Sequence, residues 1–402
     1  MKWETYKLKQ LCSEIVDCVN KTAPTSDVPT PYKMLRTSDI RDGKINLENL
    51  NCVTKEVYEK WTRRGKLQKG DVIFTREAPL GEVGLVREEK NYFLGQRLVL
   101  FRANNKMCDG RFLMYSLLWH DNKQAIISKG VGSTVAHLRV PECENIEIKV
   151  PDLDVQHRIA DILSAYDDLI ENNQKQIKLL EEAAQRLYKE WFVDLRFPGH
   201  ENTKIVDGVP EGWSKSTVSE ASAILRRGIS PKYNEKARGI VINQKCIRQT
   251  IVSYDEARTQ EKKYPAELEM MESDIVICST GAGTLGRVGQ IFEAKGNATL
   301  DSHVTLIRAN ERVGQQYLFW SLKMQQDYLM SAGKGSTNQL ELSRETIGNC
   351  EIIVPERKMA GQAEKNFAAI HDKMKECSMQ IARLREARDL LLPKLMSGEV
   401  EV

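Results

Sequence analysis

The chain has 402 residues, of which 41% are hydrophobic and 29% charged, and its formal net charge is +3. No run of about 18 apolar residues occurs, so the sequence predicts no transmembrane helix. The small positive charge permits a nucleic-acid partner but does not by itself indicate one. The first ten residues, MKWETYKLKQ, contain no apolar core and therefore do not predict a signal peptide.

The nine cysteines and six histidines are dispersed along the chain. There is no CxxC pair and the number of cysteines is odd, which favours reduced thiols and a cytoplasmic location over a disulfide framework. No histidine has metal-ligand spacing to a cysteine, so no metal site is predicted.

Mixed α/β domains and long helices are expected to alternate along the chain. The first domain shows the strand-like runs DVIFT, EVGLV, RLVLF and NIEIKV and one helix over about 110–128. The predicted order is a first α/β domain over 1–151, a long helix over 152–192, a linker rich in turn residues over 193–213, a second α/β domain over 214–355 and a second long helix over 356–402. The predicted fold class is therefore α+β.

The two domains are copies of one another. GDVIFTREAPLGEVGLV resembles SDIVICSTGAGTLGRVGQI, LFRAN recurs as LIRAN, RFLMYSLLW resembles QYLFWSLKM, KGVGST recurs as GKGST, and IEIKVP recurs as CEIIVP. The order is the same in both halves, and the offset is nearly constant: Leu285 follows Leu80 by 205 positions and Ser336 follows Ser133 by 203. A fixed period of this kind indicates an internal repeat.

The long helices repeat as well, and each has an apolar seam with steps of three and four residues. If the first is helical throughout, it is on the order of 55 Å long, and a rod of that length needs a partner to bury its seam. Only Arg388 interrupts the second seam. We therefore predict that the two helices close an antiparallel intramolecular coiled coil. The first seam is predicted at Ile159, Ile162, Tyr166, Leu169, Asn173, Ile177, Leu180, Ala184, Leu187 and Trp191, and the second at Phe367, Ile370, Met374, Cys377, Ile381, Leu384, Leu391 and Leu395.

Motifs of common enzyme classes are missing. The sequence contains no GxxxxGK[ST] phosphate loop, and the glycine-rich stretch 281–289 lacks the lysine, so a turn between two strands is favoured there. The Asn/Asp-Pro-Pro-aromatic motif of adenine methyltransferases does not occur. Asp152 and Asp154 stand at a helix start, where helix capping is favoured over nuclease chemistry.

Polar loops of both domains offer side chains suited to DNA. Arginine pairs with guanine edges and Asn or Gln with adenine edges, whereas Ser, Thr and Lys suit phosphates. The loops differ between the copies, with Arg36 and Thr37 in one where Asn243 and Gln244 stand in the other, as two different recognition surfaces on one scaffold require. The candidates are Arg36, Thr37, Ser38, Lys44, Arg63, Arg64, Thr75, Arg76, Lys129, Ser133, Thr134 and His137 in the first domain, and Arg226, Arg227, Lys232, Asn243, Gln244, Lys245, Thr280, Thr284, Lys334, Ser336, Thr337, Asn338 and Gln339 in the second.

Each candidate has an ordinary alternative, because polar loops cover any soluble domain. The Gly-Ser-Thr loops are favoured over the rest, since small polar residues permit close backbone approach and recur in both copies. Asn172 and Asn173 either set the helix register by a buried polar contact or face water. Trp191 and Phe192 are expected to pack at the end of the first helix.

These motifs together resemble the DNA-specificity subunit of type I restriction-modification systems, over essentially the whole length. The resemblance is carried by the repeated domain ending in the Gly-Ser-Thr loop, by PDLDVQHRIADIL at the start of the first long helix, by WFVDLRFPGH after it and by LLPKLMSGEV near the C-terminus. The second copy departs from the helix-start pattern: in PERKMAGQAEKNF, Gln362 is displaced and the Ile-Ala-x-Ile-Leu run before Phe367 is absent.

The resemblance implies a non-enzymatic subunit that binds a bipartite DNA sequence, with one target-recognition domain for each half. It implies two modification subunits that carry S-adenosylmethionine and methylate adenine, and restriction subunits that use ATP and Mg²⁺. No cofactor would be bound by this chain, no membrane partner is expected, and the helices would act as spacer and docking surface. The alternatives are a coiled-coil adaptor that binds only proteins and a fused DNA-modifying enzyme.

Overall fold

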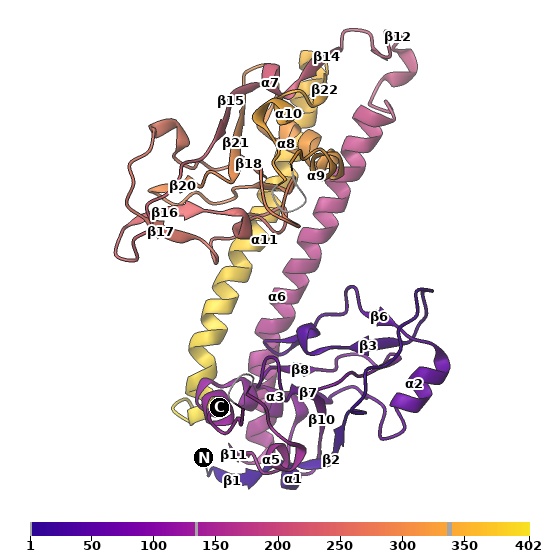
Figure 1. The fold of residues 1–402 in the computed structure, drawn as a ribbon, viewed down its shortest axis with the longest axis vertical. Helices are drawn as coiled ribbons and strands as arrows, with labels where there is room; N and C mark the ends of the chain where they lie inside the picture. The colour runs from indigo at the N-terminus through magenta and orange to yellow at the C-terminus, as the bar shows by residue number, and fades with distance from the viewer. Residues whose placement is uncertain (1, 133–135, 336–339) are drawn as a thin grey trace. The chain divides into compact units, whose positions relative to one another are not determined.

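The computed structural model describes residues 2–132, 136–335 and 340–402. The chain divides into two compact units, one made of Met1–Glu171 and Ile381–Val402 and the other of Asn172–Gln380 (Figure 1). Each unit contains one α/β domain and a part of both long helices, α6 (Leu153–Tyr188) and α11 (Arg357–Ser397).

The domain of the first unit is built on two small sheets. An antiparallel sheet has the order β2–β10–β7–β8, and a second sheet has the order β6–β3–β9, in which β3 and β9 run parallel. β1 (Glu4–Lys7) pairs with β11 (Glu147–Val150), so the two ends of the domain meet next to α6. The remaining bounds are α1 (Leu8–Leu11), β2 (Cys12–Asp17), β3 (Lys33–Leu35), η1 (Thr37–Asp39), β4 (Ile40–Arg41), β5 (Lys44–Ile45), β6 (Asn51–Cys52), α2 (Lys55–Trp61), β7 (Val72–Thr75), β8 (Val83–Leu85), β9 (Tyr92–Leu94), β10 (Leu98–Ala103) and α5 (Val140–Glu144).

The domain of the second unit repeats both of these sheets strand for strand, whereas the short β4–β5 pair of the first unit has no counterpart among the described strands of the second. Its sheets have the orders β15–β21–β18–β19 and β17–β16–β20, and β14 pairs with β22. The internal repeat predicted from the sequence is therefore confirmed as a repeat of structure. The bounds are β14 (Ser214–Thr217), α7 (Val218–Ala221), β15 (Ser222–Arg227), β16 (Gly239–Ile242), η4 (Gln244–Cys246), β17 (Arg258–Gln260), η5 (Ala266–Leu268), β18 (Ile275–Cys278), β19 (Val288–Gln290), β20 (Ala298–Leu300), β21 (Val304–Ala309), α8 (Gln315–Met324), α9 (Gln326–Ser331), α10 (Arg344–Gly348) and β22 (Glu351–Val354).

The single helix expected over 110–128 is wrong, because two helices occupy this stretch. They are α3 (Gly110–Leu118) and α4 (His120–Ser128), separated by Trp119, whose ψ of 130° is extended. The side-chain amide of Asn122 donates a hydrogen bond of 2.8 Å to the carbonyl of Ser116, which satisfies a group that the break leaves without a helical partner.

The predicted linker also carries some structure. A π-helical turn, η2 (Lys189–Val193), follows α6, and η3 (His200–Asn202) leads into a hairpin of β12 (Ile205–Val206) and β13 (Val209–Pro210). Trp191 and Phe192 are buried in the core of the second unit, as expected for packing residues.

The long helices pair antiparallel inside each unit. In the first unit, Val155 and Ile159 near the start of α6 share a core with Leu395 and Met396 at the end of α11. In the second unit, Ala184 and Tyr188 near the end of α6 share a core with Met359, Ala363 and Phe367 near the start of α11. The predicted pairing is thereby confirmed, and the altered sequence before Phe367 still leaves that ring fully buried.

The seam predicted on α6 is wrong at one turn. Leu169 is 51% exposed, whereas Ile170 and Asp167 are 1% and 5% exposed. The buried Asp167 carboxylate accepts hydrogen bonds of 2.6 Å from the Tyr115 hydroxyl and from the Arg388 guanidinium. Arg388, which interrupts the second seam, therefore serves as the counter-ion of this aspartate. Of the asparagine pair, Asn173 is buried and Asn172 is exposed.

Each domain is also tied to a long helix by hydrogen bonds at a helix start. In the first unit, the side chain of Gln156 on α6 accepts from the backbone N–H of Asp109 at 3.1 Å, and Asp109 caps α3. In the second unit, Glu364 on α11 accepts from the backbone N–H groups of Gln316 and Tyr317 at 3.1 and 2.9 Å, at the start of α8. A carboxylate there is favoured by the helix dipole, so the second copy replaces its missing glutamine contact with a charged cap.

Replacing Arg388 by Met leaves Asp167 buried without its cation. We expect the free energy of unfolding of the first unit to fall by about 3 kcal/mol, because an unpaired buried carboxylate is costly. Urea unfolding of the full chain, followed by circular dichroism, measures this change. Arg385→Met, at an exposed position on the next turn, is the matched control and is expected to cost little.

Adding Asp167→Asn to Arg388→Met removes the unpaired charge and keeps a partner for the Tyr115 hydroxyl. We expect the double variant to recover at least half of the loss. A double variant no more stable than Arg388→Met alone would contradict the ion-pair explanation.

Candidate nucleic-acid interface

The first candidate loop of each unit follows the central strand of the three-stranded sheet. In the first unit it begins after β3, where the Arg36 guanidinium donates to both carboxylate oxygens of Asp39 at 2.8 and 3.0 Å. This charge-assisted fork raises the pKa of Arg36 and holds its side chain along the loop. Thr37 is half-buried, and Ser38 is exposed beside it.

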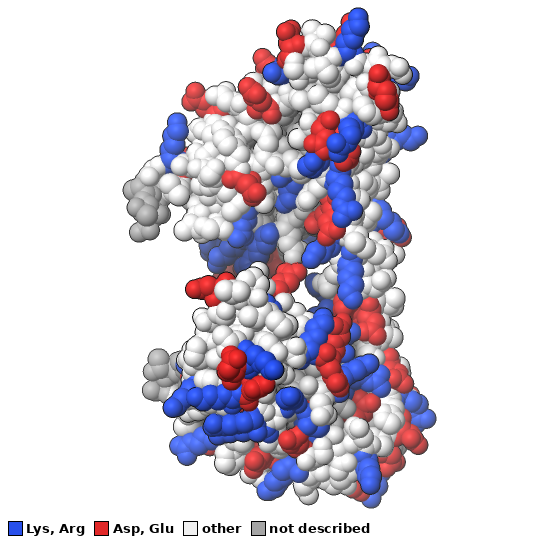
Figure 2. All heavy atoms as spheres, turned by 90° about the vertical axis from the view of Figure 1, so that its right-hand side faces the viewer, with Lys and Arg blue, Asp and Glu red and all other residues white. Residues whose placement is uncertain are grey.

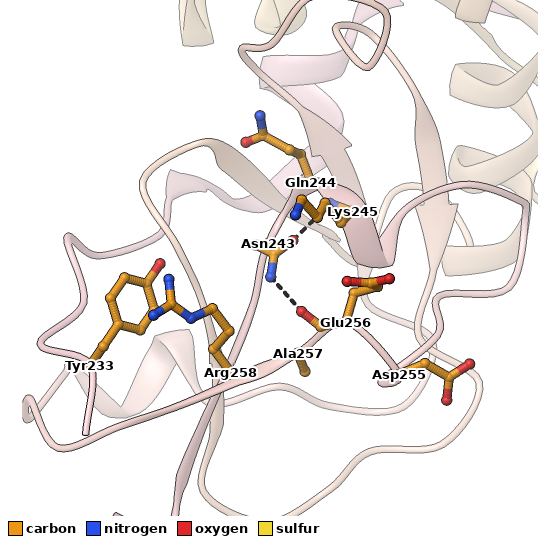
Figure 3. Close-up of a pocket in the computed structure, with 8 residues that line it drawn as sticks. All are labelled: Tyr233, Asn243, Gln244, Lys245, Asp255, Glu256, Ala257 and Arg258. Carbon is orange, nitrogen blue, oxygen red and sulfur yellow. Dashed lines mark hydrogen bonds between the residues drawn. The ribbon is translucent and has the colours of Figure 1, made fainter. Parts of the chain in front are cut away.

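The matching loop of the second unit follows β16 and is held by Asn243. The Asn243 side chain accepts from the backbone N–H of Lys245 at 2.8 Å and donates to the carbonyl of Glu256 at 2.7 Å. Because both ends of this buried amide are engaged, Asn243 shapes the loop and does not offer itself to DNA. Gln244 is half-buried and Lys245 exposed, and both line a pocket of about 350 Å³ (Figure 3).

The glycine-rich stretch forms the turn between β18 and β19, as the sequence predicts. Gly281 has a φ of +105°, and a Cβ atom there would lie 2.6 Å from the Gln244 amide nitrogen and 2.3 Å from the Thr284 hydroxyl. Only glycine fits at this position. Because it has no side chain, the side chains of Gln244 and Thr284 can both lie next to it. The Thr280 hydroxyl lies 2.7 Å from Nδ1 of His303.

Thr75 in the matching turn of the first unit is a correction to the predicted interface. Its side chain is fully buried, donating to the carbonyl of Pro79 at 2.6 Å and accepting from the N–H of Glu82 at 2.8 Å. It closes the turn after β7 and does not face a ligand. The sequence places a threonine at the end of a strand, and the pattern alone does not reveal that the turn folds over it.

Several candidate cations are engaged inside their own unit. Arg76 pairs with Asp17 at 3.2 Å and donates to the carbonyl of Leu138 at 3.1 Å, and Arg64 donates to the carbonyl of Cys18 at 2.9 Å. In the second unit, Arg227 donates to the carbonyl of Leu342 at 2.7 Å. Arg226 pairs with Glu267 and Lys232 with Glu261, and the second contact raises the pKa of Lys232.

Lys44 lies beside the long helices. Burial lowers its pKa, and its charged neighbours are Asp167, Arg385, Arg388 and Arg87. Its ammonium is half-buried, so it is less available to a DNA phosphate than the exposed candidate cations.

The residues that flank the Gly-Ser-Thr segments pair in the same way in both units. Val131 and His137 exchange backbone hydrogen bonds of 3.0 Å, and Lys334 and Glu341 exchange bonds of 3.0 and 2.9 Å. Lys129 lies two positions before the first pair, and Lys334 belongs to the second. Ser133, Thr134, Ser336, Thr337, Asn338 and Gln339 lie outside the described residues.

Exposed cations gather on the first unit around α2, which has two helical turns where the second unit has only η5 (Figure 2). The amino group of Lys60 lies 5.6 Å from the centre of the Trp61 ring, and that of Lys66 lies 6.0 Å from the centre of the Tyr58 ring. Cations interleaved with aromatic rings suit a nucleic-acid backbone and its bases. The exposed basic residues of this patch are Lys55, Lys60, Arg63, Lys66 and Lys69.

Two residues of the second pocket were missed by the sequence analysis. In the pocket of the second unit, Arg258 and Tyr233 lie side by side, with the guanidinium carbon 3.5 Å from the centre of the tyrosine ring (Figure 3). They are 25 positions apart, and no short-range pattern links an arginine and a tyrosine at that spacing. The internal repeat provides one signal for Arg258. Arg258 on β17 pairs with Val241, and Asn51 on β6 pairs with Met34, so Arg258 and Asn51 occupy matching positions in the two units.

Within the described residues, no three His, Cys, Asp or Glu side chains converge as a metal site requires. No described helix is long and apolar enough to cross a membrane. Neither finding identifies a partner. The feature that the two units share is the set of polar loops that follow β3 and β7 in the first unit and β16 and β18 in the second.

Comparison with known proteins gives matches over most of the chain. Residues 1–182 match the family described as the type I restriction modification DNA specificity domain. The HindI specificity subunit of Haemophilus influenzae is 24% identical over 91% of this chain and 94% of its own length. The MjaIX specificity subunit of Methanocaldococcus jannaschii is 26% identical over 83% of this chain and 78% of its own length.

A solved structure has the same fold. The S subunit of a type I restriction-modification system from M. genitalium superposes with a TM-score of 0.61 at 18% identity, over 98% of this chain and 96% of that one. With its duplicated domain and paired helices, the chain is thus similar over most of its length to DNA specificity subunits of type I restriction-modification systems.

Proposed function

We propose that this chain selects the DNA sequence that its complex modifies, with each α/β domain recognising one half of a bipartite target. The observation that carries the proposal is the contrast between identical scaffolds and different loops. The strand orders of the three-stranded and four-stranded sheets agree between the two domains, whereas the loops after β3 and β16 present different side chains. Two copies of one recognition domain with unlike reading loops suit a target with two unlike halves.

The chain performs no chemistry itself in this proposal. Adenine methylation belongs to two modification subunits that carry S-adenosylmethionine, and DNA cleavage to restriction subunits that use ATP and Mg²⁺. The support is the lack of a methyltransferase motif and of a phosphate loop in the sequence. Methylation by the purified chain alone with S-adenosylmethionine would overturn this part.

The long helices offer surfaces on which modification subunits dock. Leu179 on α6 and Leu390 on α11 are each 63% exposed, although other faces of the same helices are buried. A leucine this exposed would bury apolar surface if a subunit docked on its helix. An adaptor that binds only proteins would share this feature, so DNA selectivity of the assembled complex separates the two functions.

Exchanging residues 1–150 for those of a relative is expected to change one half of the recognised sequence and leave the other unchanged. The donor segment must keep the packing against Val155 and Ile159, because α6 contributes these residues to the core of the first unit. Sequencing of modified bases in a host genome reads both halves together. A change in both halves would contradict the assignment of one half to each domain.

Inserting seven residues after Glu171 and seven after Gln380 is expected to lengthen the unread gap between the half-sites. Both crossings of the chain between the units lie inside α6 and α11. Seven helical residues add about 10 Å, which corresponds to roughly three base pairs at 3.4 Å each. The same insertion at the β12–β13 turn is the control. An unchanged gap after the helix insertions would rule out the spacer role.

Leu390→Asp is expected to weaken assembly with the modification subunits by about tenfold or more, because a central apolar contact at an interface commonly contributes over 1 kcal/mol. Leu47→Asp is the matched control, since Leu47 is 43% exposed and lies on the domain rather than on a long helix. Calorimetric titration of the chain with the modification subunit measures the affinity. Equal losses for the two variants would count against docking on α11.

A further inference from the structure

The pocket of the second unit carries an inference about one base pair of the target, and it rests on the proposed function. The pocket lies between the loop after β16 and the segment that leads into β17 (Figure 3). Its volume is about 350 Å³ and its lining is mainly polar or charged. The lining residues are Tyr233, Asn243, Gln244, Lys245, Asp255, Glu256, Ala257 and Arg258.

Arg258 is oriented before any ligand arrives. Its side chain is exposed, and its guanidinium carbon lies 3.5 Å from the centre of the Tyr233 ring, which is itself 43% exposed. Stacking on an aromatic face restricts the side chain and leaves the edge of the guanidinium plane with its N–H donors available. Among the described residues, the structure gives this guanidinium no hydrogen bond and no ion pair. Arg227 and Arg308 of the same unit are both engaged by carbonyls or carboxylates.

Two carboxylates line the same pocket and decide which part of DNA suits it. Asp255 and Glu256 are exposed there, and the nearest cation to Glu256 is Arg248 at 3.7 Å. Negative side chains repel a phosphate, which carries the same charge, and accept hydrogen bonds from amino groups. A pocket that offers a forked donor and, on another part of its lining, carboxylate acceptors therefore fits a base edge better than the DNA backbone (Figure 3).

The pattern of donors and acceptors matches one type of base pair. In the major groove, guanine presents the acceptors O6 and N7, and its partner cytosine presents the N4 amino donor. Arginine binds guanine through two parallel hydrogen bonds, and Asp or Glu accepts from cytosine N4. We propose that this pocket receives the major-groove edge of a G·C base pair in the half-site read by the second unit, with Arg258 donating to guanine.

The first unit supports this assignment by contrast. Asn51 occupies on β6 the register position that Arg258 occupies on β17. Asparagine pairs with adenine in the major groove and does not form the arginine fork. The same scaffold position thus carries residues of different base preference in the two units, as expected for a position that sets specificity and not for one that holds the fold.

The test uses the complex of the full chain with its modification subunits and S-adenosylmethionine. Duplexes whose second half-site is randomised one position at a time report methylation rate against base identity. We expect wild type to require G·C at one position of that half, and Arg258→Gln to reduce the preference at that position by about tenfold to a hundredfold. Tyr233→Phe is expected to retain the preference and Tyr233→Ala to reduce it.

Two controls separate base recognition from charge and folding. Arg312→Gln removes the same charge from an exposed turn of the same unit and is expected to leave the preference profile unchanged. Replacing the required guanine by 7-deazaguanine removes the N7 acceptor and tests the contact on the wild-type complex without any protein variant. We expect this duplex to lose affinity with wild type and to lose little further with Arg258→Gln.

The outcomes distinguish this inference from the proposed function. If the wild-type complex shows no base preference in the second half-site, the proposed function itself fails. If the preference exists but Arg258→Gln leaves it intact, or weakens all sequences equally, the G·C assignment is overturned and Arg258 has a structural or phosphate-binding role. Indifference of wild type to 7-deazaguanine at the required position also overturns it.

Discussion

A buried arginine–aspartate pair, present in both units, fixes the four-stranded sheet of each domain. Asp274 is 2% exposed, and both of its carboxylate oxygens accept from Arg308, at 2.6 and 2.7 Å. Arg102 and Asp71 repeat the arrangement in the first unit at 2.8 and 2.9 Å. A two-bond fork of this kind fixes geometry as well as charge. It joins the end of one strand, β10 or β21, to the turn that enters β7 or β18.

The pair has consequences beyond its two residues. Asp274 also accepts from the backbone N–H of Met271, and Arg308 donates to the carbonyls of Glu267 and Glu269. The arginine thus holds the loop before β18 through two of its backbone carbonyls. The strand that begins at this turn ends at the glycine-rich turn near Gln244. The ion pair therefore fixes the start of the strand whose other end carries that turn.

The sequence predicted the repeat and the order of elements because these depend on local features. Alternating apolar residues, glycines at turns and helical spacing are legible within a few positions. Charged residues inside the core cannot be recognised from such local patterns, because their partners lie far away in the sequence. Asp167 looks like a surface residue and Arg388 like a defect in the seam until the fold brings them within 2.6 Å. The exposed Leu169 was placed in the seam for the same reason, since its neighbour Asp167 was assigned to the surface.

The candidate interface also shows that a local sequence pattern does not predict the partner of a polar side chain. Polar residues near strand ends were predicted to contact DNA, but the first demand on such side chains comes from the backbone of their own loop. Thr75 and Asn243 meet that demand completely. Arg36 is held by the carboxylate of Asp39, and Arg76 and Arg227 donate to the carbonyls of Leu138 and Leu342, which lie far away in the sequence. Fewer polar side chains therefore remain available to a ligand than the sequence suggests. Some of them, such as Arg258 stacked on Tyr233, can be recognised only from the tertiary structure.

This distribution of charges bears on how such a protein gains affinity for DNA. Several of the candidate cations are engaged inside their own unit, among them Arg76, Arg227 and Lys232, whereas others, such as Arg63 and Lys245, are exposed. Phosphate contacts provide most sequence-independent affinity, whereas base contacts provide discrimination. Under the proposed function, exposed cations would supply the first kind of contact. Side chains oriented by their own unit, such as Arg258 on Tyr233, would supply the second.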